Sequence, residues 1–273
     1  MFNVPSFMGF DKAGFGTPID PDAAAFFARV TAAGGTLSAT EQTAVNTLVV
    51  QMKADGIWTA MKAIYPMVGA SAAACAQNLK SASFPGTFFG LVNFASTGVT
   101  GNGSSGYMNS GFVPSTNGLT YDNNHISFYS RTTAFSGNDF FEIGSSTNSS
   151  FTDPLGLWSR RTNDSAGYDS GSTFTNRSTF SNTDGKGFYC GTAVTTTSKF
   201  FKNGVNQVSF SLTASAISSV DVFILAFNEG GGNIYYSTKE LAFASMGNGL
   251  TDTQASNFYT AVQAFQTTLG RQV

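Results

Sequence analysis

Charge is scarce in this 273-residue sequence. Asp, Glu, Lys and Arg together make up 11% of the residues, whereas about 25% is usual for a globular protein. Fourteen Lys and Arg against sixteen Asp and Glu leave a formal net charge of −2 at pH 7, with no basic tract. Capture of nucleic acid or of an anionic membrane surface is therefore not expected, because both depend on clustered positive charge.

Metal-binding and redox residues are also few. His125 is the single histidine, and the two cysteines, Cys75 and Cys190, stand far apart. A zinc site needs about four ligands in close spacing, which these residues do not supply. Two thiols far apart in a sequence are more often buried and unreactive than linked by a disulfide. One disulfide between them is the alternative.

Calcium is the metal that is hardest to exclude, because oxygen-rich loops can bind it. Several aspartates fall in such loops, namely Asp153, Asp164, Asp169 and Asp184. Their spacing does not match an EF-hand loop. No cofactor and no metal site are therefore predicted.

Long apolar runs are missing as well. The most apolar stretch, 222–227, has the length of a strand and is far shorter than the roughly 20 residues that a membrane-spanning helix needs. The first residues lack a basic segment followed by an apolar one, so no signal peptide is expected. We expect no membrane span.

Apolar and aromatic residues are plentiful. Hydrophobic residues make up 41% of the sequence, and 27 residues are phenylalanine, so the chain can fill a core. The surface must then consist largely of Ser, Thr, Asn and Gly, which do little to repel a neighbouring molecule. Such a surface suits a protein that packs against others.

The amino-terminal part divides into an arm and a helical lead-in. Residues 1–20 contain four phenylalanines among Gly and Pro and form an extended aromatic arm, which either packs on its own domain or docks on a neighbouring subunit. Residues 21–80 are the helical lead-in. Asp20 and Pro21 favour a helix start, Ser38 and Glu41 have capping-box spacing, and a third, shorter segment at 57–65 ends before a proline.

Residues 81–273 have the sequence pattern of a β-sandwich, with a helix predicted at 251–269. Short runs rich in β-branched and aromatic residues alternate with turn residues. Strands are expected at 87–94, 106–112, 126–132, 139–144, 156–161, 187–192, 199–202, 205–212, 220–227 and 234–244. Asn203 and Gly204 suit a type I′ hairpin, and Thr251 and Gln254 form a capping pair at the start of the helix.

The best catalytic candidates are Asp139 and Glu142. They are three residues apart, so in a regular strand they point to opposite faces, whereas a sandwich glycosidase needs two carboxylates together. His125 lies in a turn that leads into a strand, and the sequence has no G-x-S-x-G motif. A histidine with a satisfied hydrogen bond at a turn or strand edge is the preferred interpretation. The sequence predicts no enzyme.

A polar loop at 162–169 is the candidate binding surface. Asn163, Asp164, Tyr168 and Asp169 combine an amide, carboxylates and an aromatic ring, which are the groups that bind sugar hydroxyls and stack on a sugar face. The alternative is an ordinary sandwich loop, since most loops carry no function.

Three segments carry a family resemblance. Residues 241–273 resemble the end of a family of bacteriophage virion and tail-fibre-like proteins that carry a concanavalin A-like (laminin-G-like) jelly roll. The sequence Phe-Phe-Lys-Asn-Gly at 200–204 is similar to a strand–turn–strand that these domains show shortly before their end. Residues 44–68 resemble the helical lead-in of the same phage proteins. These motifs are structural, and no active site of the family maps onto this chain.

The resemblance implies a mainly β fold, a concanavalin A-like antiparallel jelly-roll sandwich with an N-terminal helical lead-in and a C-terminal helix. It implies a structural protein on the surface of a phage particle, as spike, fibre or decoration, made in the host bacterial cytoplasm and located in the virion. The expected partners are other virion proteins, reached through residues 1–20, host surface glycans, and further copies of the chain in a homo-oligomer. The alternative is a carbohydrate-active enzyme, a glycan hydrolase, on the same fold.

Overall fold

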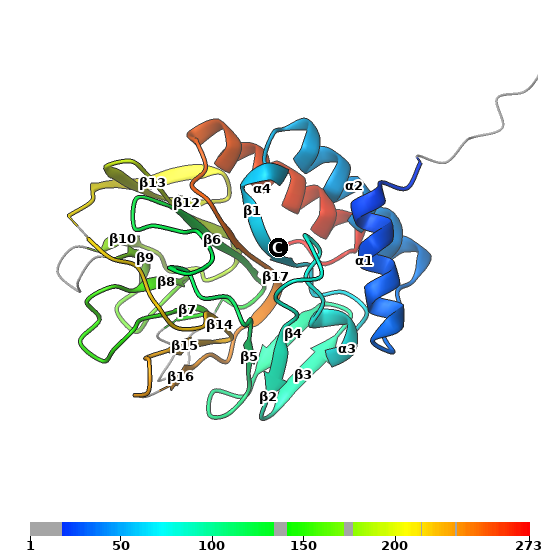
Figure 1. Cartoon of the computed structure of the whole chain (residues 1–273), viewed down its shortest axis with the longest axis horizontal. Helices are drawn as coiled ribbons and strands as arrows, with labels where there is room; N and C mark the ends of the chain where they lie inside the picture. The colour runs from blue at the N-terminus through cyan, green and yellow to red at the C-terminus, as the bar shows by residue number, and fades with distance from the viewer. Residues whose placement is uncertain (1–17, 134–140, 172–176, 214, 233) are drawn as a thin grey trace, which may run out of the picture.

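The computed structural model describes residues 18–133, 141–171, 177–213, 215–232 and 234–273 (Figure 1). Most of the predicted arm at 1–20 lies outside the described residues, and so do the docking contacts predicted for it. No helix in the described part of the chain is both long and apolar enough to span a membrane.

The predicted helix starts are confirmed. Helix α1 (Pro21–Ala32) begins at Asp20, whose side chain accepts a hydrogen bond from the backbone N–H of Asp22. Helix α2 (Ala39–Ala54) begins with the predicted capping box, in which the Ser38 and Glu41 side chains bond each other's backbone N–H. Each cap satisfies N–H groups that have no partner within the helix.

The expectation of a third helical segment at 57–65 is wrong. One 3₁₀ turn, η1 (Trp58–Ala60), is followed by strand β1 (Met61–Tyr65). Strand β1 pairs with β17 (Glu240–Gly247) in antiparallel register, and this distant partner outweighs the local helical pattern. The lead-in therefore contributes a strand to the sandwich, followed by the short helix α3 (Ala72–Cys75).

Two sheets form the body of the molecule. Sheet A has the order β13-β12-β11-β6-β17-β4-β3, with β1 beside β17. Its remaining strands are β3 (Val92–Ala95), β4 (Gly98–Gly101), β6 (Asn123–Ser130), β11 (Gly187–Val194), β12 (Thr197–Lys202) and β13 (Val205–Ser211). In the β12–β13 hairpin both Asn203 and Gly204 have positive φ, at 50° and 74°, as predicted for a type I′ turn.

Sheet B has the order β10-β9-β8-β7-β14-β5-β2. Its strands are β2 (Thr87–Phe89), β5 (Tyr107–Asn109), β7 (Ile143–Ser145), β8 (Leu155–Trp158), β9 (Ser165–Ser170), β10 (Ser178–Ser181) and β14 (Phe223–Ile224). Strand β15 (Ala226–Asn228) pairs in parallel with β7 and antiparallel with β16 (Ile234–Tyr236). The sequence pattern missed β4, β9 and β10, in which Gly or Ser makes up half of the residues.

The sandwich has two principal apolar layers, because sheet A is buried on both faces. Phe128 of β6 and Tyr189 of β11 lie between the two sheets. Their sequence neighbours Tyr129 and Phe188 point the opposite way, into a second layer beneath the helices, as the alternation of a strand requires. The predicted fold class, a mainly β antiparallel sandwich with a C-terminal helix, is confirmed.

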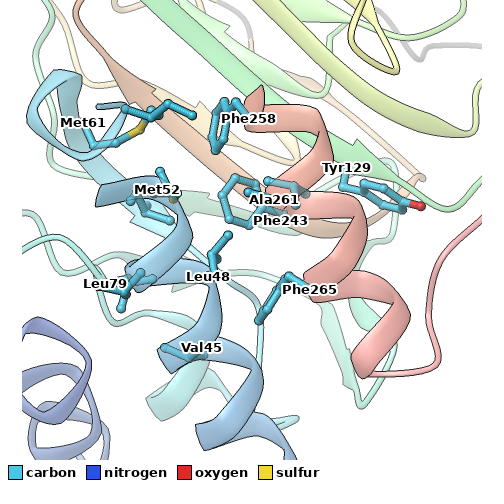
Figure 2. Packing of buried hydrophobic residues seen from close by; sticks show 14 of the residues in the cluster. Val45, Leu48, Met52, Met61, Leu79, Tyr129, Phe243, Phe258, Ala261 and Phe265 are labelled. Atoms are coloured by element: carbon cyan, nitrogen blue, oxygen red, sulfur yellow. The ribbon is translucent and has the colours of Figure 1, made fainter. Parts of the chain in front are cut away.

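The C-terminal helix α4 (Asp252–Thr268) packs on the protein's own sandwich, as expected. Figure 2 shows Phe258 and Phe265 pointing from α4 toward Leu48 of α2 and Phe243 of β17. The predicted capping pair, Thr251 and Gln254, is also present at the start of the helix.

Arg271, just beyond α4, anchors the end of the chain. Its guanidinium is buried and donates to the backbone carbonyls of Pro66, Met67 and Ala242, while its Nε donates to Gln266 Oε1. Burial lowers the pKa of Arg271 to about 10. The carboxyl end is thereby tied both to the loop after β1 and to β17.

The two cysteines are free and buried, which agrees with the preferred interpretation of the sequence. Cys75 lies in the layer between the sheets and Cys190 in the layer beneath the helices. Burial raises the pKa of both thiols to about 12. Both are therefore protonated at neutral pH and chemically inert.

Candidate functional site

The outer face of sheet B is the broad surface that the helices leave uncovered. Helices α1, α2 and α4 pack on the sheet A side of the sandwich, and the labels of β2, β5, β14 and β16 lie well away from them in Figure 1. This outer face has two ends with different chemistry, one at β8–β9 and the other at β2–β5–β14.

The polar loop predicted at 162–169 is only partly a loop, because β9 begins at Ser165. Asn163 and Asp164 lie in the turn between β8 and β9. Asn163 Oδ1 accepts a hydrogen bond from Ser165 Oγ at 2.7 Å. The Asp164 carboxylate forms an ion pair with Arg160 at 2.8 Å.

Tyr168 and Asp169 are buried within β9, in contrast to the loop expectation. The Tyr168 ring lies between the sheets, and its hydroxyl donates to Asn124 Oδ1. Burial raises the pKa of this phenol. The Tyr168 ring therefore has no exposed face on which a sugar could stack. Successive side chains of a strand point to opposite faces of the sheet, and sequence alone does not show that Tyr168 is the one that points inward.

Asp169 points to the outer face but is also enclosed. It accepts two hydrogen bonds from Arg177, and the closest N–O distance of the pair is 2.6 Å. Burial raises the pKa of Asp169, while the nearby Arg177 charge opposes that rise. The Arg161 and Arg177 guanidinium groups lie 3.8 and 4.8 Å from the Trp158 ring centroid. This end of the face is a packed ionic and aromatic cluster.

Glu142 belongs to the same packed end. Its carboxylate lies 2.8 Å from Lys239 Nζ, and the two side chains are 1% and 0% exposed. The backbone N–H and the hydroxyl of Ser159 also donate to it. Asp139, the other carboxylate of the predicted pair, lies outside the described residues. In this structure Glu142 is the buried partner of a lysine.

His125 lies inside strand β6 rather than in a turn or at a strand edge. Strand β6 runs between β11 and β17, and the histidine side chain is fully buried. Its Nδ1 lies 2.5 Å from the backbone carbonyl oxygen of Asn248, so the predicted hydrogen bond is present. Burial lowers the pKa of His125 to about 4, and the ring is neutral at pH 7.

The four aspartates considered for calcium do not converge. Asp153 accepts from Ser146 and Thr147, and Asp184 accepts from the backbone N–H of Lys186. Asp164 and Asp169 are bound to arginines. Within the ranges that the structure describes, no three His, Cys, Asp or Glu side chains gather in a metal-binding group.

The other end of the outer face carries what we call the tyrosine platform. It consists of four rings and three polar side chains, namely Phe89, Tyr107, Phe223, Tyr236, Thr87, Asn109 and Asp221. The Tyr107 ring is central. It stacks on Phe89 at 5.1 Å between centroids and lies 4.5 Å from Phe223 and 6.0 Å from Tyr236. Phe89 remains 45% exposed.

Strand alternation and register bring the platform together. Phe88, Met108 and Ile224 point into the core between the sheets, so their neighbours on each strand point outward. Phe89 is paired with Tyr107 across β2 and β5. Asn109 is paired with Thr87 on one side and with Phe223 on the other.

The polar groups of the platform are only partly engaged. Asn109 Nδ2 donates to Asp221 Oδ2 at 3.0 Å. The hydroxyls of Thr87, Tyr107 and Tyr236 and the Oδ1 atom of Asp221 form no hydrogen bond within the described ranges. Burial, together with the nearby Tyr236 hydroxyl, raises the pKa of Tyr107, so it is a neutral donor. Stacked rings and uncommitted polar atoms therefore share one surface.

Comparison with known proteins gives likeness in structure but not in sequence. No protein-family model matches the chain, and no curated protein matches it. Domain 4 of AbnA, a GH43 extracellular arabinanase from Geobacillus stearothermophilus solved in complex with arabinotriose, aligns with a TM-score of 0.54 at 11% identity. The alignment covers 73% of this chain and 98% of that one.

Two further solved structures align over a smaller share of their own length. A mutant Trypanosoma rangeli sialidase with trans-sialidase activity gives a TM-score of 0.57 at 9% identity, covering 81% of this chain and 39% of that one. The binding domain of botulinum neurotoxin serotype D gives 0.50 at 10% identity, covering 75% and 52%. At such identities the likeness establishes the fold alone. The chain is an antiparallel β-sandwich of the jelly-roll type.

Proposed function

We propose that this protein binds glycans through the tyrosine platform, without hydrolysing them, as a structural component on the surface of a phage particle. The observation that carries the glycan-binding part is the Tyr107 ring, partly exposed among three other rings and next to the uncommitted oxygen of Asp221.

The platform combines the two kinds of contact that a sugar needs. A hexose ring presents C–H groups on its faces and hydroxyls around its edge. Aromatic rings offer the apolar surface, and tyrosine adds a polar tip. A few polar groups placed around an apolar surface then fix the orientation of the ligand. Among the solved structures of similar fold, the arabinanase domain holds arabinotriose, which supports a sugar as the ligand class.

The absence of hydrolysis is part of the proposal. Glycoside hydrolysis ordinarily requires two carboxyl groups about 5–10 Å apart on either side of the scissile bond. Asp221 is the one carboxylate of the tyrosine platform. Glu142 is buried against Lys239, where a sugar has no access. A glycan hydrolase remains the alternative function, supported by the glycosidases among the structures of similar fold.

Placement on a phage particle rests on the resemblance of residues 241–273, 200–204 and 44–68 to virion proteins. Docking of residues 1–20 on other virion proteins, and assembly as a homo-oligomer, belong to the same proposal. A mass-spectrometric inventory of purified particles tests it. The protein is expected among the virion components, and its absence there would remove the virion role while leaving glycan binding to be judged separately.

Binding is tested with Tyr107→Ala against a panel of oligosaccharides, including β-glucan fragments and host surface polysaccharide. Loss of the central ring should weaken binding about tenfold, or by ~1.4 kcal/mol. Tyr259→Ala is a matched control, because Tyr259 is a partly buried tyrosine on α4 whose ring stacks on Phe188, on the opposite side of the sandwich. Equal binding by a folded Tyr107→Ala protein would refute the assignment, and release of shorter sugars by the wild type would favour the hydrolase.

A further inference from the structure

We infer that Asp221 makes the tyrosine platform selective for uncharged sugars over acidic ones. The inference rests on the proposed glycan binding and adds to it the chemical class of the ligand. Among the side chains that define the platform, the carboxylate of Asp221 is the single formal charge.

Asp221 is held in place from two directions. Its Oδ2 atom accepts a hydrogen bond from Asn109 Nδ2 at 3.0 Å. Its backbone carbonyl accepts another from Asn228 Nδ2 at 2.9 Å. The side chain is partly exposed. The carboxylate is therefore a fixed, solvent-accessible negative charge beside the rings.

The charge of Asp221 is not neutralised within the described part of the chain. It forms no ion pair there, and its only side-chain hydrogen bond is to the uncharged Asn109. At the other end of sheet B, Arg161 lies over the Trp158 ring, and three further basic side chains are paired with carboxylates. Arg160 is paired with Asp164, Arg177 with Asp169, and Lys239 with Glu142.

A neutral and an acidic sugar interact differently with the Asp221 carboxylate. A sugar hydroxyl can donate to Asp221 Oδ1, and a hydrogen bond to an ionised acceptor is stronger than one between neutral groups. A uronic or sialic acid brings a second carboxylate instead. Repulsion between two carboxylates a few ångström apart, at a dielectric between those of water and a protein surface, should weaken binding about tenfold.

The test uses pairs of oligosaccharides of identical linkage and length that differ only at C6, where the acidic member (galacturonic or glucuronic acid units) carries a carboxylate in place of the hydroxymethyl group of the neutral member (galactose or glucose units). The wild-type protein is expected to bind the neutral member of a pair about tenfold more tightly by titration calorimetry. Asp221→Asn should bind the neutral member a few-fold more weakly and lose the preference. Asp55→Asn is the matched control, because Asp55 also accepts from a side-chain amide, that of Gln51, but lies in the helical layer.

The preference should also shrink as salt is raised toward 1 M, because exposed charges are then screened. This second measurement needs no variant. Wild-type protein that binds the acidic member equally or more tightly would overturn the inference while leaving glycan binding intact, as would a neutral preference unaffected by salt. Failure of every sugar to bind would remove the proposed function together with this inference.

Discussion

Truncating Phe265 tests whether α4 is part of the sandwich core. The side chain is 2% exposed, its ring centroid lies 6.4 Å from that of Phe243, and the Arg271 guanidinium lies 5.2 Å from it. Phe265→Ala removes these contacts and leaves a cavity. Such substitutions in protein cores cost about 3–5 kcal/mol of unfolding free energy.

The surroundings of Phe265 favour the lower end of that range. A cleft of about 110 Å³ between α2 and α4 already borders the ring and is lined partly by Thr47, Gln51 and Thr260. Because water can reach these polar walls, part of the new space will be hydrated rather than empty. We therefore expect a loss of about 3 kcal/mol, equivalent to a melting temperature about 6–12 °C lower.

The assay is thermal unfolding of the isolated full chain, followed by circular dichroism and calorimetry. Phe89→Ala serves as the control, because the Phe89 ring is 45% exposed on the tyrosine platform and its loss should cost about 1 kcal/mol or less. An unchanged melting temperature for Phe265→Ala would show that the apolar face of α4 is not part of the core of the isolated chain.

Two further predictions concern buried titratable groups. Glu142→Gln should lower the unfolding free energy by about 3–5 kcal/mol, because it breaks the buried pair with Lys239. Glu240→Gln is the control: its pair with Arg131 has side chains that are 22% and 19% exposed, so its loss should cost about 1 kcal/mol or less. A fully stable Glu142→Gln protein that lost a hydrolytic activity would contradict this prediction. Because burial lowers the pKa of His125 from 6.5 to about 4, the unfolded chain binds a proton at higher pH than the native one. Stability should therefore fall by up to about 3 kcal/mol between pH 6.5 and 4. The imidazole NMR signals of this single histidine should titrate near pH 4, and a midpoint near 6.5 would disprove its burial.

The helix ends were predictable because their causes are local. Ser38 and Glu41, like Thr251 and Gln254, are three residues apart and bond each other's backbone. The Asn203–Gly204 turn is equally local, since it depends on the φ angles of two adjacent residues. By contrast, 57–65 has a helical pattern, and the distant strand β17 decides that most of it is extended.

The tyrosine platform could not be predicted from the sequence, because it too depends on the pairing of strands that are distant in the chain. Tyr107 and Tyr236 are neighbours through the pairing of separate strands and belong to no motif. Tyr168 was predicted as a sugar-stacking ring because it lies among polar residues. The alternation of β9 turns it into the core and leaves Asp169 facing outward to Arg177.

The sequence by itself determined the scarcity of charge, the absence of a basic tract, the helix caps and the β-rich class of the chain, because each depends on residue counts or on neighbours within a few positions. The tertiary structure decided which side chains face outward and which are buried, because those outcomes depend on the order and register of strands far apart in the chain. Asp221 beside Asn109 and Glu142 beside Lys239 are both carboxylates in polar contact. The tertiary structure leaves Asp221 partly exposed and buries Glu142.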